Sequence, residues 1–386
     1  MIAISMMALS LMRTERGKFM YKIFASLFAT ILISALLVPF VRYLAFKIGA
    51  VDKPNARRIN KRIMPTMGGL AIFIAFNFTN FVLLRSQYPM KQLIALFVAQ
   101  CVIITTGVID DIYELKPYQK LIGITAAALI VYYAAHVRMT TLTLPFIGTV
   151  DLGILSLPIT LIWILAITNA INLIDGLDGL ATGVAIIALT TSALTGYFFL
   201  NVTNTFISIM MFTLVAALIG FLPYNFYPAT IYLGDTGSLF IGFMISVFAL
   251  FGLKNATFIS IIIPVIILGV PITDTVYAII RRAVNKKPIM KPDKHHLHHR
   301  LLQMGLTHRQ TVLVIYGIAL IFSFISLLYP LSNILGSILL TIATLFGLEI
   351  FVEVIGLVGS GKQPLLNLIK KVVLMVAENH NQENKK

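Results

Sequence analysis

Carboxylates and carboxamides gather in one short polar stretch of an otherwise apolar chain. This stretch, 169–180, carries Asn172, Asp175 and Asp178 between two hydrophobic segments, in a protein with only 15 acidic residues. A carboxylate at the edge of a membrane segment is costly, so its presence indicates a function. Such side chains suit the binding of a cation or a phosphorylated ligand. Asp175 and Asp178 would also fit an N-terminal cap of the next helix, and the two interpretations are compatible.

A second acidic cluster ends another apolar segment. Asp110 and Asp111 close this segment, and Lys120 begins the next one. Acids are unfavourable at the C-terminal end of a helix dipole, and a lysine is unfavourable at the N-terminal end. Two unfavourable choices so close together predict a buried acid–base pair, although a solvated turn would also produce them. We take all three as candidate catalytic residues.

A third cluster lies in the polar stretch 225–238, directly before a further apolar segment. Glycine and hydroxyl residues at a helix start form an anion site, and an acid beside a phosphate indicates a divalent cation. We therefore predict Asp235 as a catalytic residue and metal ligand, with Asn172 as the second ligand. An aspartate that only capped the helix would not need these glycine and hydroxyl neighbours. The aromatic ring of Tyr232 could in addition stack on the planar base of a nucleotide. The candidate substrate-binding residues of the stretch are Asn225, Tyr232 and Gly234.

Histidines and basic residues mark two further loops. Residues 293–300 contain four histidines, a run that suits a metal or the oxygens of a diphosphate or sugar. No cysteine or second histidine pair completes a zinc centre, so we favour substrate contact, with an ordinary basic loop as the alternative. Proline and paired glycines in 61–69 fit a helix entry with close backbone approach. The candidate substrate-binding residues of these regions are Lys61, Thr66, Arg281, His296, His298 and His299.

Composition identifies the chain as a polytopic membrane protein. The 386 residues are 58% hydrophobic and only 12% charged, whereas soluble domains carry about 25% charged residues and lack repeated apolar runs of about 20. The single cysteine lies in an apolar run, so there is no intrachain disulfide. The net charge of +15 indicates topology rather than nucleic-acid binding. The N-terminal apolar stretch precedes its basic residues, an order unlike that of a signal peptide.

Apolar runs of helical length predict an all-α fold with about eleven spans. Asp274 lies inside the ninth of them, and the sequence leaves open whether it pairs with a basic residue or acts in the site. The expected spans are 23–46, 65–84, 92–109, 121–137, 153–170, 180–200, 205–223, 236–253, 256–280, 311–329 and 332–358.

Basic residues predict the sidedness of these spans. Most of the 30 lysines and arginines fall in alternate loops, and the positive-inside rule places those loops in the cytoplasm. The segment 1–21 would then lie outside, the spans would occupy 22–360, and the tail 361–386 would be cytoplasmic. All candidate site residues would face the cytoplasm, in the loops 49–65, 110–120, 168–180, 223–238 and 281–309.

Together these segments resemble the polyprenyl-phosphate N-acetylhexosamine-1-phosphate transferases of glycosyltransferase family 4. The resemblance covers most of the chain, and the motifs occur in the family's order. They are 65–69, 110–111, 172–179, 234–238 and the histidine loop. The resemblance implies a Mg²⁺-dependent transfer, with Mn²⁺ as a candidate substitute, of a sugar 1-phosphate from a UDP-sugar to a polyprenyl phosphate, with release of UMP.

The histidine loop also distinguishes two branches of that family. His296-Leu-His298-His299-Arg300 resembles the branch that uses UDP-N-acetylglucosamine and undecaprenyl phosphate to begin teichoic acid or surface polysaccharide synthesis at the plasma membrane. The phospho-N-acetylmuramoyl-pentapeptide transferases, whose loop has a histidine run followed by Phe-Glu, are the alternative. A secondary transporter is the rival of another class, but its acids should lie in mid-span. The sequence leaves open whether the chain forms a homodimer.

The family reaction assigns expected roles to the candidates. Asp110 or Asp111 would deprotonate or position the lipid phosphate, with Lys120 orienting the pair. Asp235 and Asn172 would hold Mg²⁺ at the diphosphate. The uridine end would be bound by Asp175, Asp178, Lys61, Thr66 and Tyr232.

Overall fold

The computed structural model describes residues 15–52, 63–144, 147–199, 205–252, 256–284, 286, 296–357, 363–368 and 371. The candidate residue Lys61 lies outside these ranges, as do most of the segments 1–21 and 361–386.

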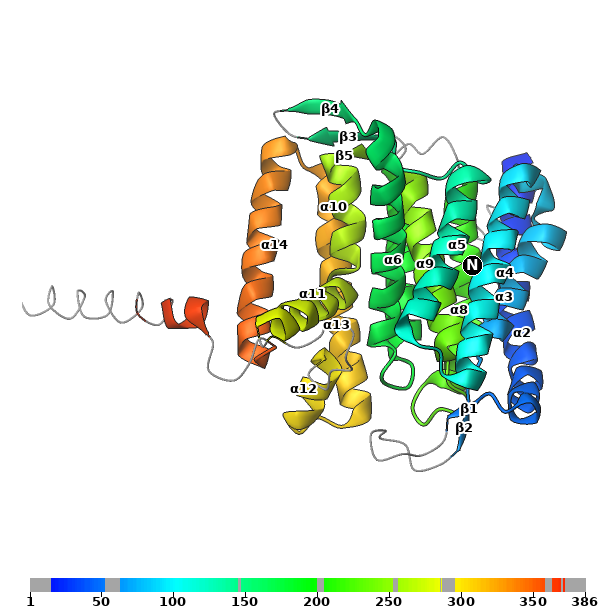
Figure 1. The fold of residues 1–386 in the computed structure, drawn as a ribbon. Coiled ribbons are helices and arrows are strands. Elements are labelled where there is room, and N and C mark those ends of the chain that lie inside the picture. The colour runs from blue at the N-terminus through cyan, green and yellow to red at the C-terminus, as the bar shows by residue number, and fades with distance from the viewer. Residues whose placement is uncertain are drawn as a thin grey trace, which may run out of the picture.

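Helices make up most of the described chain, and the long ones run side by side (Figure 1). The long helices are α2 (Glu15–Ile48), α4 (Met90–Tyr113), α6 (Ser156–Ile174), α7 (Leu180–Phe198), α8 (Thr205–Asn225), α9 (Gly234–Gly252), α13 (His308–Leu328) and α14 (Ile334–Ile355). The shorter ones are α3 (Gly69–Phe78), α5 (Pro117–Tyr133), α10 (Phe258–Ile267), α11 (Gly269–Val284) and α12 (Leu297–Gln303). Single turns of 3₁₀ or π helix lie at Thr79–Leu83, Arg85–Gln87, Gly153–Leu155 and Tyr329–Leu331.

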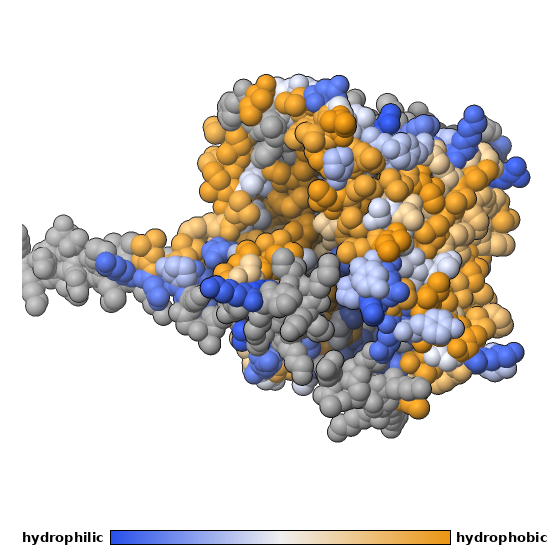
Figure 2. Space-filling model, in the orientation of Figure 1, coloured by the Kyte–Doolittle hydropathy of each residue, from blue (hydrophilic) through white to orange (hydrophobic). Residues whose placement is uncertain are grey.

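The predicted class of polytopic, helical membrane protein is confirmed. Within the described ranges, 8 helices are long and apolar enough to cross a membrane. The number is 9 when the bent pair α10–α11 is counted as one span. The segments α3 and α5 also coincide with predicted spans but have only 10 and 17 residues. Figure 2 shows a broad hydrophobic surface around the helices, with hydrophilic residues concentrated toward its two ends. Because lipid offers no hydrogen bonds, helices satisfy their own backbone groups across this belt.

The ninth predicted span, 256–280, is sharply bent. Helices α10 and α11 meet at a bend of 83° between Ile267 and Gly269, and Figure 1 shows α11 running across the bundle rather than along it. Asp274 therefore lies beyond the bend, in a helix that points toward the histidine loop. The hydrophobic pattern continues through the bend, although Gly269 and Pro271, two residues that disfavour a straight helix, stand directly after it.

Short strands occur at both ends of the bundle, although the sequence predicted none. Strands β1 (Val51–Asp52) and β2 (Met64–Pro65) pair antiparallel at one end. At the other end β3 (Thr141–Leu144) lies between antiparallel β4 (Gly148–Asp151) and parallel β5 (Ala256–Thr257).

Helix α9 occupies the centre of the bundle, where it packs against α3, α4 and α6. Of the eight long apolar helices α9 is the most enclosed and α14 the least. The first turn of α9 lies so close to α3 that a Cβ atom on Gly69 of α3 would overlap Gly237 of α9. The paired glycines of 61–69 thus serve helix packing, and they fix the start of α9 against α3.

Candidate active site

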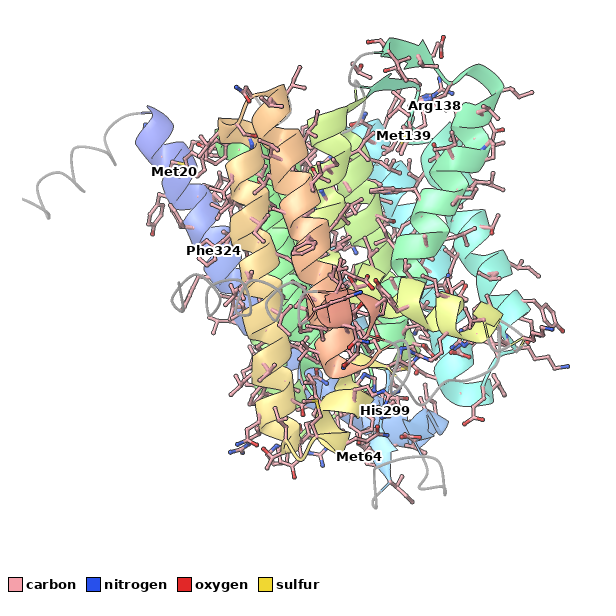
Figure 3. The ribbon with its side chains drawn as sticks, turned by 90° about the vertical axis from the view of Figure 1, so that its left-hand side faces the viewer. Met20, Met64, Arg138, Met139, His299 and Phe324 are labelled. Atoms are coloured by element: carbon pink, nitrogen blue, oxygen red, sulfur yellow. The ribbon has the colours of Figure 1, made fainter. Side chains whose placement is uncertain are left out.

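Most of the predicted polar residues meet at one end of the bundle. Helices α4 and α6 end there, and α5, α7 and α9 begin there, beside the β1–β2 pair (Figure 1). In Figure 3, His299 and Met64 lie at this end, and Arg138 and Met139 lie at the opposite one. Residues more than a hundred positions apart in the sequence therefore share one polar region at the edge of the hydrophobic belt.

Lys120 joins two of the predicted catalytic carboxylates. Its Nζ atom forms an ion pair with Asp110 Oδ2 and lies 2.9 Å from Asp235 Oδ2. Asp110 is almost fully buried, with 3% of its side chain exposed, and its other oxygen accepts the Leu115 amide at 2.6 Å. The acid–base pair predicted from the misplaced charges of α4 and α5 is confirmed.

Asp111 has a different environment from its neighbour. Its Oδ1 accepts the Asp235 amide at 2.9 Å, and its Oδ2 accepts both the amide and the hydroxyl of Thr236, at 3.0 and 2.6 Å. The sequence suggested that the start of α9 would bind a phosphate, but the anion at these amides is Asp111. The left-handed Gly234 (φ +72°) lies beside it, and a Cβ atom there would overlap the Asp111 carboxylate. Asp111 therefore caps α9 and places Asp235.

Asn172 reaches the same carboxylate from the end of α6. Its side-chain nitrogen donates to Asp235 Oδ1 and to Ser238 Oγ, the latter at 2.8 Å. Asn172 and Asp235 are thus adjacent, as their predicted shared role requires. The atom directed at Asp235 is the amide nitrogen, whereas a metal would need the amide oxygen.

Asp175 lies close to the same group of charges. Burial, followed by the negative charges of Asp235, Asp111 and Asp178, raises the pKa of Asp175 well above its usual range. These carboxylates are therefore crowded. Lys120 supplies the positive charge that Asp110 and Asp235 contact.

Asp178 connects three segments and does not cap α7, whose N-terminal cap position is Gly179. Its Oδ2 accepts the Ala229 amide at 3.0 Å, and its own amide donates to His308 Nε2 at 3.0 Å. The imidazole of His308 stacks on Tyr227 at 4.5 Å between ring centroids. Because Gly179 and not Asp175 is the cap residue, the capping interpretation of this pair is wrong. The contacts of Asp178 instead fix the loop that follows α6.

Sequence reasoning missed His308 and its neighbour Arg309, whose guanidinium lies 5.7 Å from the Tyr227 ring centre. Both are basic residues in the first turn of α13, where the helix dipole disfavours positive charge. The same argument that singled out Lys120 would have found them.

Two candidate residues from the other stretches are tied into the framework. Thr66 is buried, and its hydroxyl donates to the Ala50 carbonyl at 3.0 Å. Asn225 is also buried, accepts from the Thr182 hydroxyl at 2.7 Å and donates to the Ile231 carbonyl. Substrate binding by either residue stays a prediction.

The backbone of Tyr232 is fixed on both sides by the segment that begins α3. Its amide donates to the Pro65 carbonyl at 2.9 Å, and its carbonyl accepts the Gly68 amide at 3.0 Å. The predicted stacking role of its side chain stays a prediction.

The histidine loop docks on the end of α11 and on the loop after α6. His296 Nδ1 lies 2.8 Å from Asp274 Oδ2, and the His298 ring lies where a Cβ atom on Gly176 would overlap it. Burial, followed by repulsion from His299, lowers the pKa of His298 to about 3. His298 is therefore neutral at physiological pH in this arrangement, and its contact with substrate stays a prediction.

Arg281 contacts the segment that follows α14. Its side chain is buried, and Nη1 donates to the Leu357 carbonyl at 2.5 Å. This contact holds the end of α11 against the end of α14. Substrate binding by Arg281 stays a prediction.

The arrangement suits a shared cation site rather than a closed one. Within the described ranges, no group of three or more histidine, cysteine or acidic side chains could hold a metal ion by itself. Mg²⁺ commonly uses one or two carboxylates and completes its shell with water and substrate phosphates. The crowded carboxylates around Asp235 fit such an ion by charge and by ligand type.

Comparisons with known proteins agree with these motifs. A model of glycosyl transferase family 4 matches residues 93–253. A probable undecaprenyl-phosphate N-acetylglucosaminyl 1-phosphate transferase of Bacillus subtilis is 43% identical over 92% of this chain and 98% of its own length. The chain belongs to this family.

Other family 4 transferases are similar over less of the chain. A decaprenyl-phosphate N-acetylglucosaminephosphotransferase of Mycolicibacterium smegmatis is 34% identical over 72% of this chain and 74% of its own length. A phospho-N-acetylmuramoyl-pentapeptide-transferase of Clostridium beijerinckii is 30% identical over 76% of this chain and 90% of its own length. The family model includes Asp110, Asp111, Lys120 and Asp235, so the charged group described above lies inside the matched region.

Proposed function

We propose that this family 4 transferase moves N-acetylglucosamine 1-phosphate from UDP-N-acetylglucosamine to undecaprenyl phosphate and releases UMP. The main support is the position of Lys120, which contacts both Asp110 and Asp235 at the end of the bundle where α4 and α5 meet α9. The similarity to the Bacillus subtilis protein supports this choice of substrates. The product would enter teichoic acid or surface polysaccharide synthesis.

The chemistry requires two anions to approach each other. An oxygen of the lipid phosphate attacks the phosphorus that carries the sugar. A new P–O bond forms, the bond from that phosphorus to the bridging oxygen breaks, and UMP leaves. Fixed groups that hold the reactants in line and offset their charge supply most of such a barrier. Lys120 is suited to the second task because its ammonium group lies between two carboxylates at the membrane edge.

The different contacts of the two adjacent aspartates suggest different roles. We assign Asp110 to the lipid phosphate, because one of its oxygens faces Lys120 and can exchange that contact for a proton or a substrate. Asp111 uses both oxygens to hold the start of α9. It is a positioning residue for Asp235 in this assignment. The sequence left open which of the two would act on the phosphate.

Mg²⁺ is the proposed cofactor, and Asp235 would be its ligand. Asn172 would join it after its side-chain amide turns to present oxygen, as it now donates to Asp235. When bound, the ion would neutralise charge on the diphosphate and on departing UMP. The negative charges of Asp111, Asp178 and Asp235, which surround Asp175, support a cation among these residues.

The nucleotide would lie on the side of the site formed by the loops that follow α6 and α8. Asp178 ties these loops together through the Ala229 amide and His308. A uridine between them would meet Asp175 and the aromatic ring of Tyr232. This placement keeps the bulky sugar and diphosphate toward Asp235 and the histidine loop.

We also propose eleven spans with the site facing the cytoplasm. The site lies at the end of α2 that carries Ile48, and the β3–β4 hairpin lies at the other end (Figure 1). The basic loops fall at the site end, which the positive-inside rule assigns to the cytoplasm. Labelling of cysteines introduced for Asp151 and Met304 in intact cells, in a Cys101→Ala background, tests this. Only the cysteine at position 151 should react with a membrane-impermeant reagent, and the reverse pattern would invert the topology.

The activity is tested with purified protein in detergent, Mg²⁺, UDP-N-acetylglucosamine and undecaprenyl phosphate. We expect UMP release that depends on both substrates, and we expect Asp110→Asn to lower it by at least about 100-fold. Asp151→Asn, which changes an exposed carboxylate at the opposite end of the bundle, is the matched control. The mass of the same sample by light scattering reports whether a homodimer forms.

A second donor separates the competing functions. Release of UMP from the UDP-muramoyl-pentapeptide alone would reassign the chain to the peptidoglycan branch. No release with either donor would refute a transferase and favour the transporter. Chelation of Mg²⁺ should stop the reaction, and turnover that persists in excess chelator would remove the cofactor from the proposal.

A further inference from the structure

Asp274 uses both of its carboxylate oxygens to hold the histidine loop. Oδ1 accepts the Leu297 amide at 2.8 Å, and Oδ2 lies 2.8 Å from His296 Nδ1. Asp274 and His296 are both buried, with 3% and 5% of each residue exposed. A buried carboxylate that contacts two successive residues in this two-point manner fixes their orientation.

The first contact determines where α12 begins. His296 occupies the N-terminal cap position of α12 with extended backbone angles (φ −64°, ψ 159°) and offers no side-chain cap of its own. The first amides of a helix need acceptors from elsewhere. Asp274 supplies one from α11, so the short helix depends on a residue more than twenty positions upstream.

The second contact selects the tautomer of His296. An ionised carboxylate carries no hydrogen, so the Nδ1 atom of His296 must donate the hydrogen in this bond. In the neutral ring Nε2 then carries the lone pair. Asp274 thus determines which ring nitrogen of His296 is free to contact a substrate.

The same geometry places the next histidine against the loop that follows α6. The His296 and His298 rings are parallel within 3°, with centroids 6.0 Å apart. His298 lies against Gly176, between Asp175 and Leu177 in the loop after α6. A shift of α12 would therefore move both histidines relative to that loop.

We infer that Asp274 is a positioning residue for the transfer reaction, acting through the tautomer of His296 and the placement of α12. This inference rests on the proposed function for its kinetic consequences. Asp274 itself does not touch the reacting phosphates. Arg281, in the last turn of α11, donates to the Leu357 carbonyl and secures that end of the helix, so the carboxylate is presented from a fixed helix.

The decisive variant is Asp274→Asn. An amide offers one acceptor and one donor, so it can keep the bond to Leu297 but presents a hydrogen to His296 Nδ1. We expect kcat to fall about 10- to 100-fold, as for other residues that orient a functional histidine. The KM for UDP-N-acetylglucosamine should change much less, because the contacts of Asp178 are untouched. Asp151→Asn again serves as the control.

A double-mutant cycle distinguishes positioning from general damage. If Asp274 acts through His296, adding Asp274→Asn to His296→Ala should cause little further loss of kcat. Fully additive losses, or full kcat in Asp274→Asn beside an active wild type, would overturn the inference while leaving the proposed function intact.

A spectroscopic measurement tests the contact without relying on activity. In protein labelled with ¹⁵N-histidine, the His296 signal, identified by its loss in His296→Ala, should report hydrogen on Nδ1 in the wild type. In Asp274→Asn the signal should move to the form with hydrogen on Nε2. An unchanged tautomer would refute the inference. A wild type that shows the expected tautomer but releases no UMP would instead refute the proposed function.

Discussion

The two adjacent aspartates should respond to substitution in opposite ways. Replacing Asp111 by alanine removes three hydrogen bonds at the start of α9, from two amides and the Thr236 hydroxyl. Replacing Asp110 by asparagine removes its ion pair with Lys120, keeps an oxygen that can accept the Leu115 amide, and leaves Lys120 paired with Asp235. We therefore expect Asp111→Ala to lower stability and Asp110→Asn to lower turnover with little loss of stability.

The magnitude follows from the contacts of Asp111. A hydrogen bond to a charged group contributes about 1.5–3 kcal/mol, and loss of a helix cap costs about 0.5–2 kcal/mol. The contacts share one carboxylate, and its removal also relieves repulsion with Asp235, so we expect a total of about 2–4 kcal/mol. For a chain of 386 residues, an unfolding entropy of about 2.1 cal/mol/K per residue converts this to a decrease of about 2–5 °C in apparent Tm.

The assay is thermal unfolding in detergent, with UMP release measured on the same samples. Asp111→Asn, which keeps one acceptor oxygen, should fall between the wild type and Asp111→Ala in apparent Tm. The apparent Tm of Asp110→Asn should stay within about 1 °C of the wild-type value, because loss of the Asp110 charge lowers the repulsion among the crowded carboxylates. An apparent Tm of Asp111→Ala equal to that of the wild type, or above that of Asp110→Asn, would refute the capping role.

Two further predictions concern packing and pH. Gly69→Ala should destabilise the protein by about 1–3 kcal/mol and reduce UMP release, because its Cβ would overlap Gly237 at the start of α9. Gly317→Ala in α13, where a Cβ meets nothing within 4 Å, is the control, and equal apparent Tm values for the two variants would contradict the prediction. Since burial lowers the pKa of His298 to about 3, the folded protein resists a proton that the unfolded chain accepts near pH 6.5. The free energy of unfolding is therefore unaffected by His298 above about pH 6.5 and decreases as the pH falls toward 3. The decrease is about 2 kcal/mol between pH 7 and 5. His298→Asn should show a smaller fall in apparent Tm between these pH values, and an unchanged fall would disprove the role of His298.

Much of the architecture could be predicted because the membrane constrains it strongly. An apolar run that crosses lipid must satisfy its backbone internally, so hydrophobicity and helix length together imply the helices. The bend between α10 and α11 escaped prediction because the span was assigned from its continuous hydrophobic run alone, without the helix-breaking residues Gly269 and Pro271 at the join. The β3–β4–β5 sheet escaped it because β3 and β5 are distant in sequence and very short.

The site was predictable as a set of residues but not as a set of contacts. Misplaced charges at helix ends identified Asp110, Asp111 and Lys120. They did not show that Asp111 would occupy the anion site at the start of α9, since that depends on how α4 packs against α9. The same dipole argument applied to α13 would have added His308 and Arg309.

By itself the sequence determined that this is a helical membrane protein, and it identified the acidic clusters that interrupt the spans. Those conclusions depend on local composition and spacing, which each segment carries independently. Only the tertiary structure decided that Asp110 and not Asp111 pairs with Lys120, that Asp111 caps α9, and that Asp274 holds the histidine loop. These roles depend on distances between helices far apart in the chain, and adjacent residues of identical chemistry acquire different functions through the neighbours that packing gives them.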